Sequence, residues 1–498
     1  KDLHLLCSYL LSAVPDLRTQ LTGHVGWHDY QILIGDYAVG KGDEILALNT
    51  TINESIDQFS KKGKLDNWRS SVAGLCTSSS PLIFSICAGF ASPLLRFTDI
   101  GSGGFHFQGT SSIGKTTLLK AAGSVIGGGE DGYISSWSTT LVGLEETALS
   151  HCDFLLCLDE LKLVDADPVK AAKKACHAVY SLANDKGKTR SSAYTGKGAS
   201  NKRWSVLVLS TGEQSLAEHA DQAGVKRLPG EEVRLIDIPA DLGCKLGIYE
   251  ELISGFTDPA KLSEAISAGS QKYYGSPIRV FLSRLIKKYD PEGLQKRIDG
   301  LVEKFVTRNV KDNAPASDRR FAKRFGLVYA GGILAVKLDI LPWKANQVRQ
   351  AVDACYIAAY ANRPGNTEKN RQKLIKRVCL KLSKMVDLLD FTTTKATDYS
   401  KAELQDCSGF KKENPNGQTC FYVRRKWLKK WCKTEAQINI ALEHFEERGL
   451  FLPGSGNDQT QQKQIAGIKK RRRYYVFTAG AANFKRSWEN QRQITIQQ

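Results

Sequence analysis

The chain has 498 residues, 42% of them hydrophobic, which is enough for more than one domain with a packed core. It carries 70 lysines and arginines against 52 acidic residues. The net charge of +18 favours a polyanionic partner such as nucleic acid, although solubility or a basic tail alone would give the same excess. The 12 cysteines include no C-x-x-C pair, so we expect a reducing compartment rather than a zinc site or a disulfide framework.

No signal peptide and no apolar run long enough to cross a membrane is apparent in the sequence, so we expect a cytoplasmic protein. The start at Lys1 rather than Met indicates a processed chain or a piece of a longer polypeptide. Residues 1–66 mix an amphipathic start with strand-like pieces, which predicts a small, collar-like α/β region without catalytic residues. A helical pattern from residue 66 to residue 95 leads into the next domain.

A strand-like segment, a glycine-bounded loop and a helical segment follow one another at residues 105–122. Gly109 and Gly114 bracket the loop, and Lys115, Thr116 and Thr117 open the helix, as in a P-loop. Backbone N–H groups of such a loop, and the helix N-terminus, would cradle the phosphates of ATP. Lys115 would reach the β- and γ-phosphates, and the Thr116 hydroxyl would ligate Mg²⁺. The alternative is a chance glycine-rich turn, against which the flanking strand and helix argue.

An unbroken apolar run at residues 154–158 ends in Asp159 and Glu160. A run without alternation suits a strand that is buried on both faces of a parallel sheet. The two acids resemble a Walker B site, in which Asp159 would hold Mg²⁺ and Glu160 would polarise the attacking water. Two acids after an apolar strand are a weak signal alone, and their position after a P-loop strengthens it.

A polar, glycine-rich and basic segment at residues 183–204 separates this strand from the next one, residues 206–209. A hairpin at this place would grip a nucleic-acid backbone in a central pore without reading bases. An ordinary solvated loop is the alternative. The cations that would make these contacts are Lys186, Lys188, Arg190, Lys197, Lys202 and Arg203.

Three further residues are predicted to complete the site. Thr211 follows the strand at residues 206–209 and would sense the γ-phosphate. Arg234, directly before an apolar strand at residues 235–239, is the first candidate for an arginine finger that acts on a neighbouring subunit's nucleotide. Arg227 is the second candidate. Either arginine would equally serve as a surface or ion-paired residue.

The rest of the chain is predicted to be helical up to a linker at residues 363–366. Arg320 and Arg324 lie one turn apart on a predicted helix and would contact nucleotide from a lid, or be solvated or paired. Beyond the linker, two helices and a strand pair around a basic loop predict a winged helix. Its wing, with Lys470, Arg471 and Arg472, would meet a phosphate backbone, unless the domain docks protein instead.

Taken together, these segments resemble a family of predicted ATPases of phages, plasmids and genomic islands, which are often linked to primase domains. The resemblance rests on residues 66–69, 104–107, 109–117, 158–161, 209–213 and 232–235, and on Arg320 and Arg324-Phe325. The layout is similar to that of AAA+ helicases of the superfamily 3 and minichromosome-maintenance kind. The resemblance implies a hexameric ring that uses ATP and Mg²⁺, with a primase or polymerase as a further partner.

We therefore expect an α/β protein with four regions: an N-terminal region (1–66), an AAA+ P-loop ATPase core with a parallel sheet (67–240), a helical lid (241–365) and a winged-helix nucleic-acid-binding domain (366–498). The expected function is an ATP-driven DNA helicase or translocase in the replication of a phage or mobile genetic element. Two alternatives remain: a replication initiator or helicase loader that does not unwind, and a ring ATPase that remodels proteins.

Overall fold

The structure is a computed structural model. It describes residues 2–12, 19–40, 45–49, 55–129, 132–161, 168–185, 203–222, 233–363, 368–384, 388–432, 435–454, 459–464 and 471–483, and every structural statement below concerns these residues. The chain forms two compact units, Lys1–Asn362 and Arg363–Gln498, which divide next to the predicted linker. Each unit is described separately.

Unit 1 begins with a helix and small sheets. Strands β2, β3 and β4 form an antiparallel sheet, and β1 pairs with β5 in parallel. The Trp27 side chain fixes this region to the rest of the unit, because its indole N–H donates to the Pro93 carbonyl at 2.8 Å. The elements are α1 (Asp2–Ser12), β1 (Thr19–Thr22), β2 (Gly26–His28), β3 (Gln31–Ile34), β4 (Tyr37–Val39), β5 (Ile45–Leu48) and the 3-10 helix η1 (Ser55–Phe59).

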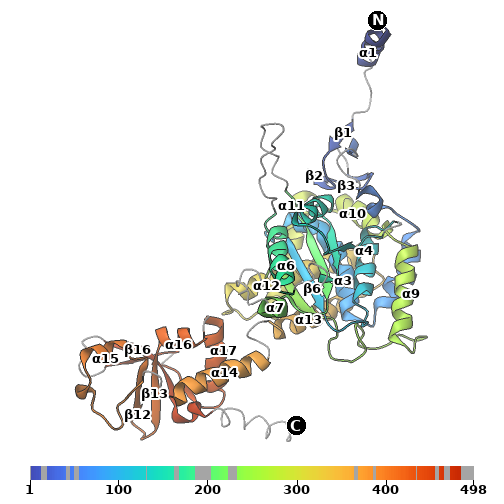
Figure 1. Ribbon diagram of the computed structural model, residues 1–498. Helices are drawn as coiled ribbons and strands as arrows, with labels where there is room; N and C mark the ends of the chain where they lie inside the picture. Colours follow the sequence, from blue (N-terminus) through green and yellow to red (C-terminus); the bar gives the residue numbers. More distant parts are fainter. Residues whose placement is uncertain are drawn as a thin grey trace. The chain divides into compact units, whose positions relative to one another are not determined.

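A five-stranded parallel sheet forms the centre of unit 1 (Figure 1). Its strands are β6 (Gly103–Gln108), β7 (Ser135–Ser136), β8 (Leu155–Asp159), β9 (Leu207–Gly212) and β10 (Leu235–Pro239). They lie in the order β10-β6-β9-β8-β7, so β9 separates the strand before the glycine-rich loop from the strand that ends in Asp159. The parallel sheet predicted from the apolar runs is confirmed.

Both faces of the sheet are buried along β8 and β9, which explains the unbroken apolar runs at residues 154–158 and 206–209. Alternate residues face opposite ways: Leu155 and Cys157 join the core under α3 and α4, whereas Leu156 and Leu158 join a second core with α5 and α6. The helices of this part are α2 (Leu65–Ser71), α3 (Ser80–Ala91), α4 (Lys115–Ile126), α5 (Leu141–Ser150), α6 (Pro168–Leu182) and α7 (Leu216–Gln222), with the 3-10 helices η2 (Ala73–Cys76) and η3 (Ser92–Phe97).

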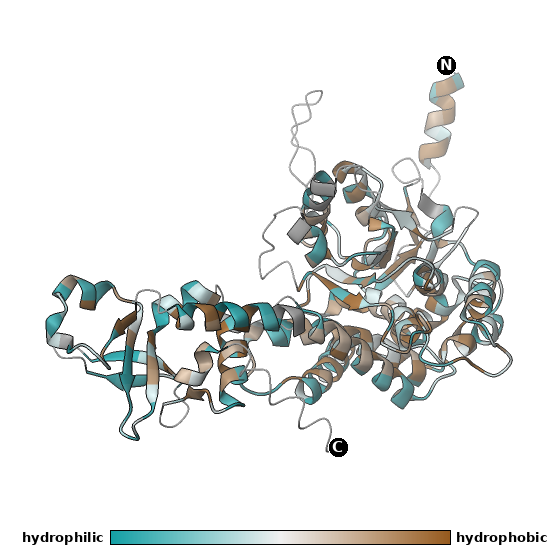
Figure 2. Cartoon of the chain, turned by 60° about the horizontal axis from the view of Figure 1, so that its bottom comes forward, coloured by the Kyte–Doolittle hydropathy of each residue, from teal (hydrophilic) through white to brown (hydrophobic). Residues whose placement is uncertain are grey.

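The described residues after the sheet are mainly helical, in the region where the sequence predicts helices. The helices are α9 (Pro259–Lys272), α10 (Ser276–Lys288), α11 (Pro291–Asn309), α12 (Ala316–Lys337) and α13 (Ala345–Ala361). They share one continuous core with the sheet face that carries Phe105 and Phe107. Phe325 of α12 packs its ring on Phe84 of α3 and on Phe105 of β6. Figure 2 shows hydrophobic segments gathered inside this unit and hydrophilic turns on its outside.

One helical stretch differs from the sequence analysis, which found no apolar run long enough to span a membrane. Ser80–Phe97, which comprises α3 and η3, meets that length and composition, and 83% of it is buried inside the protein. All but one of the residues of α3 are buried, because α4, α12 and α13 pack around it. The stretch is therefore the central helix of the unit 1 core.

Unit 2 contains one mixed sheet, four α-helices and the 3-10 helices η5 (Ala396–Asp398) and η6 (Ala479–Ala482) in its described residues. The strands run in the order β11-β12-β13-β16-β14, and β15 forms an antiparallel pair with β16. Helices α14, α16 and α17 pack on one another around Leu428, Phe445 and Phe477. The elements are α14 (Glu368–Ser383), β11 (Leu388–Asp390), α15 (Lys401–Asp406), β12 (Gly409–Glu413), β13 (Thr419–Arg424), α16 (Arg425–Cys432), α17 (Glu435–Glu446), β14 (Phe451–Leu452), β15 (Gln461–Lys463) and β16 (Arg472–Thr478).

Candidate nucleotide-binding site

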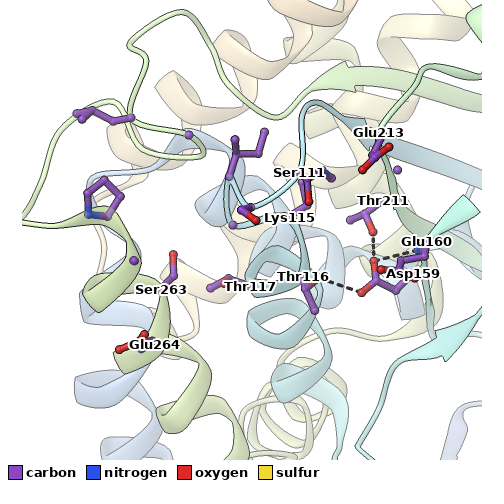
Figure 3. Close-up of a pocket in the computed structure, with 18 of the residues that line it drawn as sticks. Ser111, Lys115, Thr116, Thr117, Asp159, Glu160, Thr211, Glu213, Ser263 and Glu264 are labelled. Atoms are coloured by element: carbon purple, nitrogen blue, oxygen red, sulfur yellow. Dashed lines mark hydrogen bonds between the residues drawn. The ribbon is translucent and has the colours of Figure 1, made fainter. Parts of the chain in front are cut away.

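The carboxyl ends of β6, β8 and β9 meet at one edge of the sheet, which is where open α/β sheets bind ligands. A cavity of about 660 Å³ lies at this edge. Figure 3 shows its walls: the loop after β6, the two acids at the carboxyl end of β8, the threonine in β9 and the first turns of α9. The lining includes Gly114, Lys115, Thr116, Thr117, Asp159, Glu160 and Thr211. Gly109, the other predicted residue of the loop, is not part of the lining and contacts Lys115 through its carbonyl.

The loop between β6 and α4 turns sharply before the helix. Gly114 has φ +96°, in the left-handed region that glycine adopts at no steric cost, and Ser112 has φ +62°. The Lys115 ammonium lies over this loop and donates to the carbonyls of Gly109 at 2.8 Å and of Thr110 at 2.6 Å. Burial lowers the pKa of Lys115, and the nearby carboxylates of Glu213, Asp159 and Glu160 act in the opposite direction.

Asp159 is the centre of the polar network in the cavity. Its Oδ2 accepts a hydrogen bond from the Thr116 hydroxyl at 3.0 Å, and its Oδ1 accepts one from the Glu160 backbone N–H at 3.0 Å. The buried Thr211 hydroxyl also donates to Oδ1. Figure 3 shows the Asp159 carboxylate between the two threonines. Thr211 therefore orients the carboxylate, a contact that sequence reasoning had not assigned to it.

Glu160 differs from Asp159 in the exposure of its side chain and in its backbone conformation. Its side chain is exposed toward the cavity, and its φ of +58° is uncommon for a residue with a Cβ. Such a conformation persists only where the surroundings impose it and is typical of active sites. Here it turns the chain at the end of β8, so that two successive acids both line the cavity.

Another wall of the cavity is formed by residues outside the predicted P-loop and Walker B segments. Gly247 has φ +67°, and a Cβ there would lie 2.5 Å from the Ile113 carbonyl oxygen. That carbonyl accepts a hydrogen bond from the Ile248 N–H at 3.1 Å, so this segment supports the loop between β6 and α4. Lys245, Asp258, Ser263 and Glu264 complete the wall. Glu213, which lies next to the Thr211-Gly212 pair, is a further lining residue to which the sequence analysis gave no role.

These residues suit a magnesium-bound nucleoside triphosphate. A hydroxyl and a carboxylate, the donors of Thr116 and Asp159, are the oxygen ligands that Mg²⁺ prefers, and they already lie within hydrogen-bonding distance. The loop before α4, with its lysine and the helix N-terminus, provides the positive end of the cavity for phosphates. The donor set and the shape therefore fit the cofactors predicted from the sequence.

The three predicted arginines that the structure describes, Arg234, Arg320 and Arg324, do not line this cavity. Arg234 precedes β10, at the amino edge of the sheet, and its guanidinium lies 4.7 Å from the centre of the Tyr180 ring. The length of β10, about 16 Å, separates it from the carboxyl edge. Arg320 is exposed, and Arg227 lies outside the described residues.

Arg324 is buried at that same amino edge, with a side chain that packs inside the unit. Its guanidinium donates to the carbonyls of Val233 at 3.1 Å and of Ser102 at 3.4 Å. Burial lowers the pKa of Arg324 to about 10. Arg320 and Arg324, which a helical wheel puts on one face, thus have different environments, because the amino edge of the sheet covers only the second.

Most of the predicted basic hairpin, namely Lys186, Lys188, Arg190, Lys197 and Lys202, lies outside the described residues. Its two ends are described. Asp185 accepts a hydrogen bond from the Ser102 N–H at 3.0 Å, and the Trp204 N–H donates to the Asp185 carbonyl at 3.2 Å. Arg203, directly before Trp204, is exposed. The segment therefore starts and ends at the amino edge of the sheet, beside Arg324.

In unit 2, Lys470 lies outside the described residues. Arg471 is exposed directly before β16, and Arg472 begins that strand opposite Lys463 of β15. The basic residues thus lie at the end of the β15–β16 pair that is joined by the connecting residues 464–471.

Comparisons with known proteins bear mainly on the fold. A family model described as a domain of unknown function (DUF927) matches residues 1–202. No curated protein sequence matches the chain. A solved structure described as "SCCmec type IV Cch - active helicase" superposes with a TM-score of 0.61 and 15% sequence identity, over 96% of this chain and 82% of that one. The chain therefore has the overall α/β fold of that helicase.

Proposed function

We propose that this chain is an ATP-driven helicase or translocase that acts on DNA as a ring, in the replication of a phage or mobile genetic element. The observation that carries the proposal is the Thr116–Asp159–Thr211 network beside the P-loop lysine, at the carboxyl edge of a parallel sheet. The fold shared with a protein described as an active helicase supports the choice of helicase among the ATP-driven functions.

Each residue of the cavity has a distinct role in this proposal. The P-loop N–H groups and Lys115 would bind the β- and γ-phosphates, and Thr116 and Asp159 would hold a Mg²⁺ ion, which would supply positive charge beside the phosphates when bound. Thr211 keeps the Asp159 carboxylate in place. Glu160 is exposed to the cavity without being held as Asp159 is, so it is the residue that accepts a proton from the attacking water.

A neighbouring subunit supplies the remaining cation. Arg234 lies at the edge of the sheet opposite its own cavity, so it cannot serve that cavity without leaving its position. An arginine on the far edge suits donation across a subunit interface, as in ring ATPases with a finger in trans. Arg227 remains the second candidate.

ATP hydrolysis with and without single-stranded DNA, combined with the mass in solution, tests the proposal. We expect DNA to stimulate hydrolysis and the chain to assemble into a ring with a non-hydrolysable ATP analogue. Glu160→Gln should lower kcat by about 10²- to 10⁴-fold. Glu146→Gln, the same change at an exposed position of α5 outside the cavity, is the matched control. A hydrolysis rate that DNA does not change, or a chain that stays monomeric, would contradict the proposal of a translocating helicase. Either result would favour a loader or a protein-remodelling role.

A further inference from the structure

The positive charge of the chain is concentrated in unit 2. Residues 363–498 carry 28 lysines and arginines and 13 acids, a net charge of +15, whereas residues 1–362 carry 42 and 39, a net charge of +3. A polyanionic partner is therefore attracted mainly by unit 2.

Helix α16 presents its cations on one side. Its buried residues are Leu428, Trp431 and Cys432, spaced i, i+3 and i+4, which fixes the rotation of the helix against the core of the unit. At 100° per residue, the exposed cations cover one arc of about 140° on the remaining surface. They are Arg425, Lys426, Lys429 and Lys430.

Nearby arginines have structural roles instead. The Arg424 guanidinium donates to the carbonyls of Leu404 and Gln405, and Arg377 donates to the Trp431 carbonyl at 3.2 Å. Within the cationic face, the Lys430 ammonium lies 4.4 Å from the centre of the Trp427 ring, which limits its motion. The four exposed cations therefore form an ordered cationic face of α16, which is distinct from the wing residues.

The next helix has the opposite charge. Only residues 433–434 separate α16 from α17, as in a helix-turn-helix. In that motif the first helix crosses the phosphate backbone and the second reads the bases. Here α17 contains three glutamates and neither lysine nor arginine, and Glu443 and Glu446 are exposed. Carboxylates at these positions repel a phosphate backbone that α17 would have to approach.

We propose that α16 binds the phosphate backbone of duplex DNA and that α17 does not read its sequence, so that unit 2 holds DNA without sequence preference. The inference deepens the proposed function, on which it rests for the choice of DNA. Lys426 and Lys430 lie four residues, about 6 Å, apart along the helix and form one row of backbone contacts. Arg425 and Lys429 form a parallel row with the same spacing.

The test is binding of the full-length chain to two fluorescent DNA duplexes of unrelated sequence, measured by anisotropy from 50 to 200 mM salt. Each lost phosphate contact should reduce the slope of log K against log salt by about 0.9, so Lys426→Gln/Lys430→Gln should reduce it by about 1.8. The loss of affinity over this salt range then becomes about twelvefold smaller than for the unaltered chain. Both duplexes should be affected equally.

Lys401→Gln/Lys412→Gln is the matched control, because it removes two exposed lysines from α15 and β12 and should leave the slope unchanged. Equal melting temperatures establish that the variants are folded. An unchanged slope for Lys426→Gln/Lys430→Gln overturns the proposal. So does a tenfold preference between the duplexes that Asn439→Ala in α17 abolishes, or tighter binding of a single strand than of a duplex. Hydrolysis indifferent to DNA would instead refute the proposed function, since the duplex-binding measurement stands without it.

Discussion

Replacing Thr211 by valine tests whether this side chain orients the Asp159 carboxylate. Valine keeps the shape of the buried side chain and removes the hydroxyl that donates to Asp159 Oδ1. Oδ1 keeps its hydrogen bond from the Glu160 N–H, and Oδ2 keeps the one from Thr116. The substitution thus removes one of three contacts that hold the carboxylate.

A hydrogen bond to a charged group contributes about 1.5–3 kcal/mol. If that free energy is expressed in the transition state, the Thr211→Val variant should lose about 10- to 150-fold in kcat. Nucleotide affinity should change little, because Thr211 holds the carboxylate and does not belong to the P-loop. The half-saturating Mg²⁺ concentration should rise, since the carboxylate that holds the ion is less well oriented.

The assay is steady-state ATP hydrolysis across a Mg²⁺ titration, with binding of a fluorescent ATP analogue measured in parallel. Thr211→Ser keeps the donor and should retain most of the activity. Thr147→Val is a control of the same chemistry on α5, where the hydroxyl donates to the Gly143 carbonyl at 2.8 Å, outside the cavity. Wild-type kcat and Mg²⁺ dependence in Thr211→Val, or equal defects in the serine and valine variants, would refute the reasoning.

Three further outcomes follow from the structure. Rings of the Lys115→Ala variant alone, or of the Arg234→Ala variant alone, should be inactive. Rings assembled from a mixture of the two variants should regain about a quarter of the wild-type hydrolysis rate, because random assembly completes one site in four when the finger acts in trans. No recovery would place Arg234 outside the site. Gly247→Ala should raise the Kd for ATP by about tenfold or more, since its Cβ would press on the Ile113 carbonyl at 2.5 Å at a φ of +67°; an unchanged Kd by calorimetry would show that this segment does not support the P-loop. Burial lowers the pKa of His151 to about 4, so the unfolded chain binds a proton more readily below pH 6.5 and the folded state should lose about 2 kcal/mol between pH 8 and pH 5. His151→Phe should remove that part of the acid-induced drop in melting temperature, and an undiminished drop would contradict the assignment.

The sequence predicts the elements of the site better than their arrangement. The glycines before Lys115 and the apolar run before Asp159 are local patterns that backbone geometry and burial impose, and both elements form where predicted. The contact between Thr211 and Asp159 depends on β9 lying between β6 and β8, an order that no local pattern encodes. The wall around Gly247 escaped prediction for a similar reason, since it is a loop without periodicity that acts through its backbone.

The burial of Arg324 shows a further limit. The spacing between Arg320 and Arg324 predicts that both side chains lie on one face of the helix. The amphipathic pattern does not indicate which turn of α12 packs against the edge of the sheet. The resulting difference is large: one guanidinium is exposed, and the other is enclosed against two backbone carbonyls. A charged residue in a helix pattern is normally assigned to the surface, and only the tertiary contact reverses that assignment.

The common core of the sheet and the helices that follow it has a mechanical consequence. Because Phe325 of α12 packs against both Phe84 of α3 and Phe105 of β6, bending between these layers would open a close-packed interior. The sheet and the helices packed on it would therefore move together as one rigid body, with little deformation between them. If ATP is hydrolysed at the cavity as proposed, a movement there would be passed through this rigid body to the amino edge of the sheet, where Arg234 and both ends of the basic segment lie.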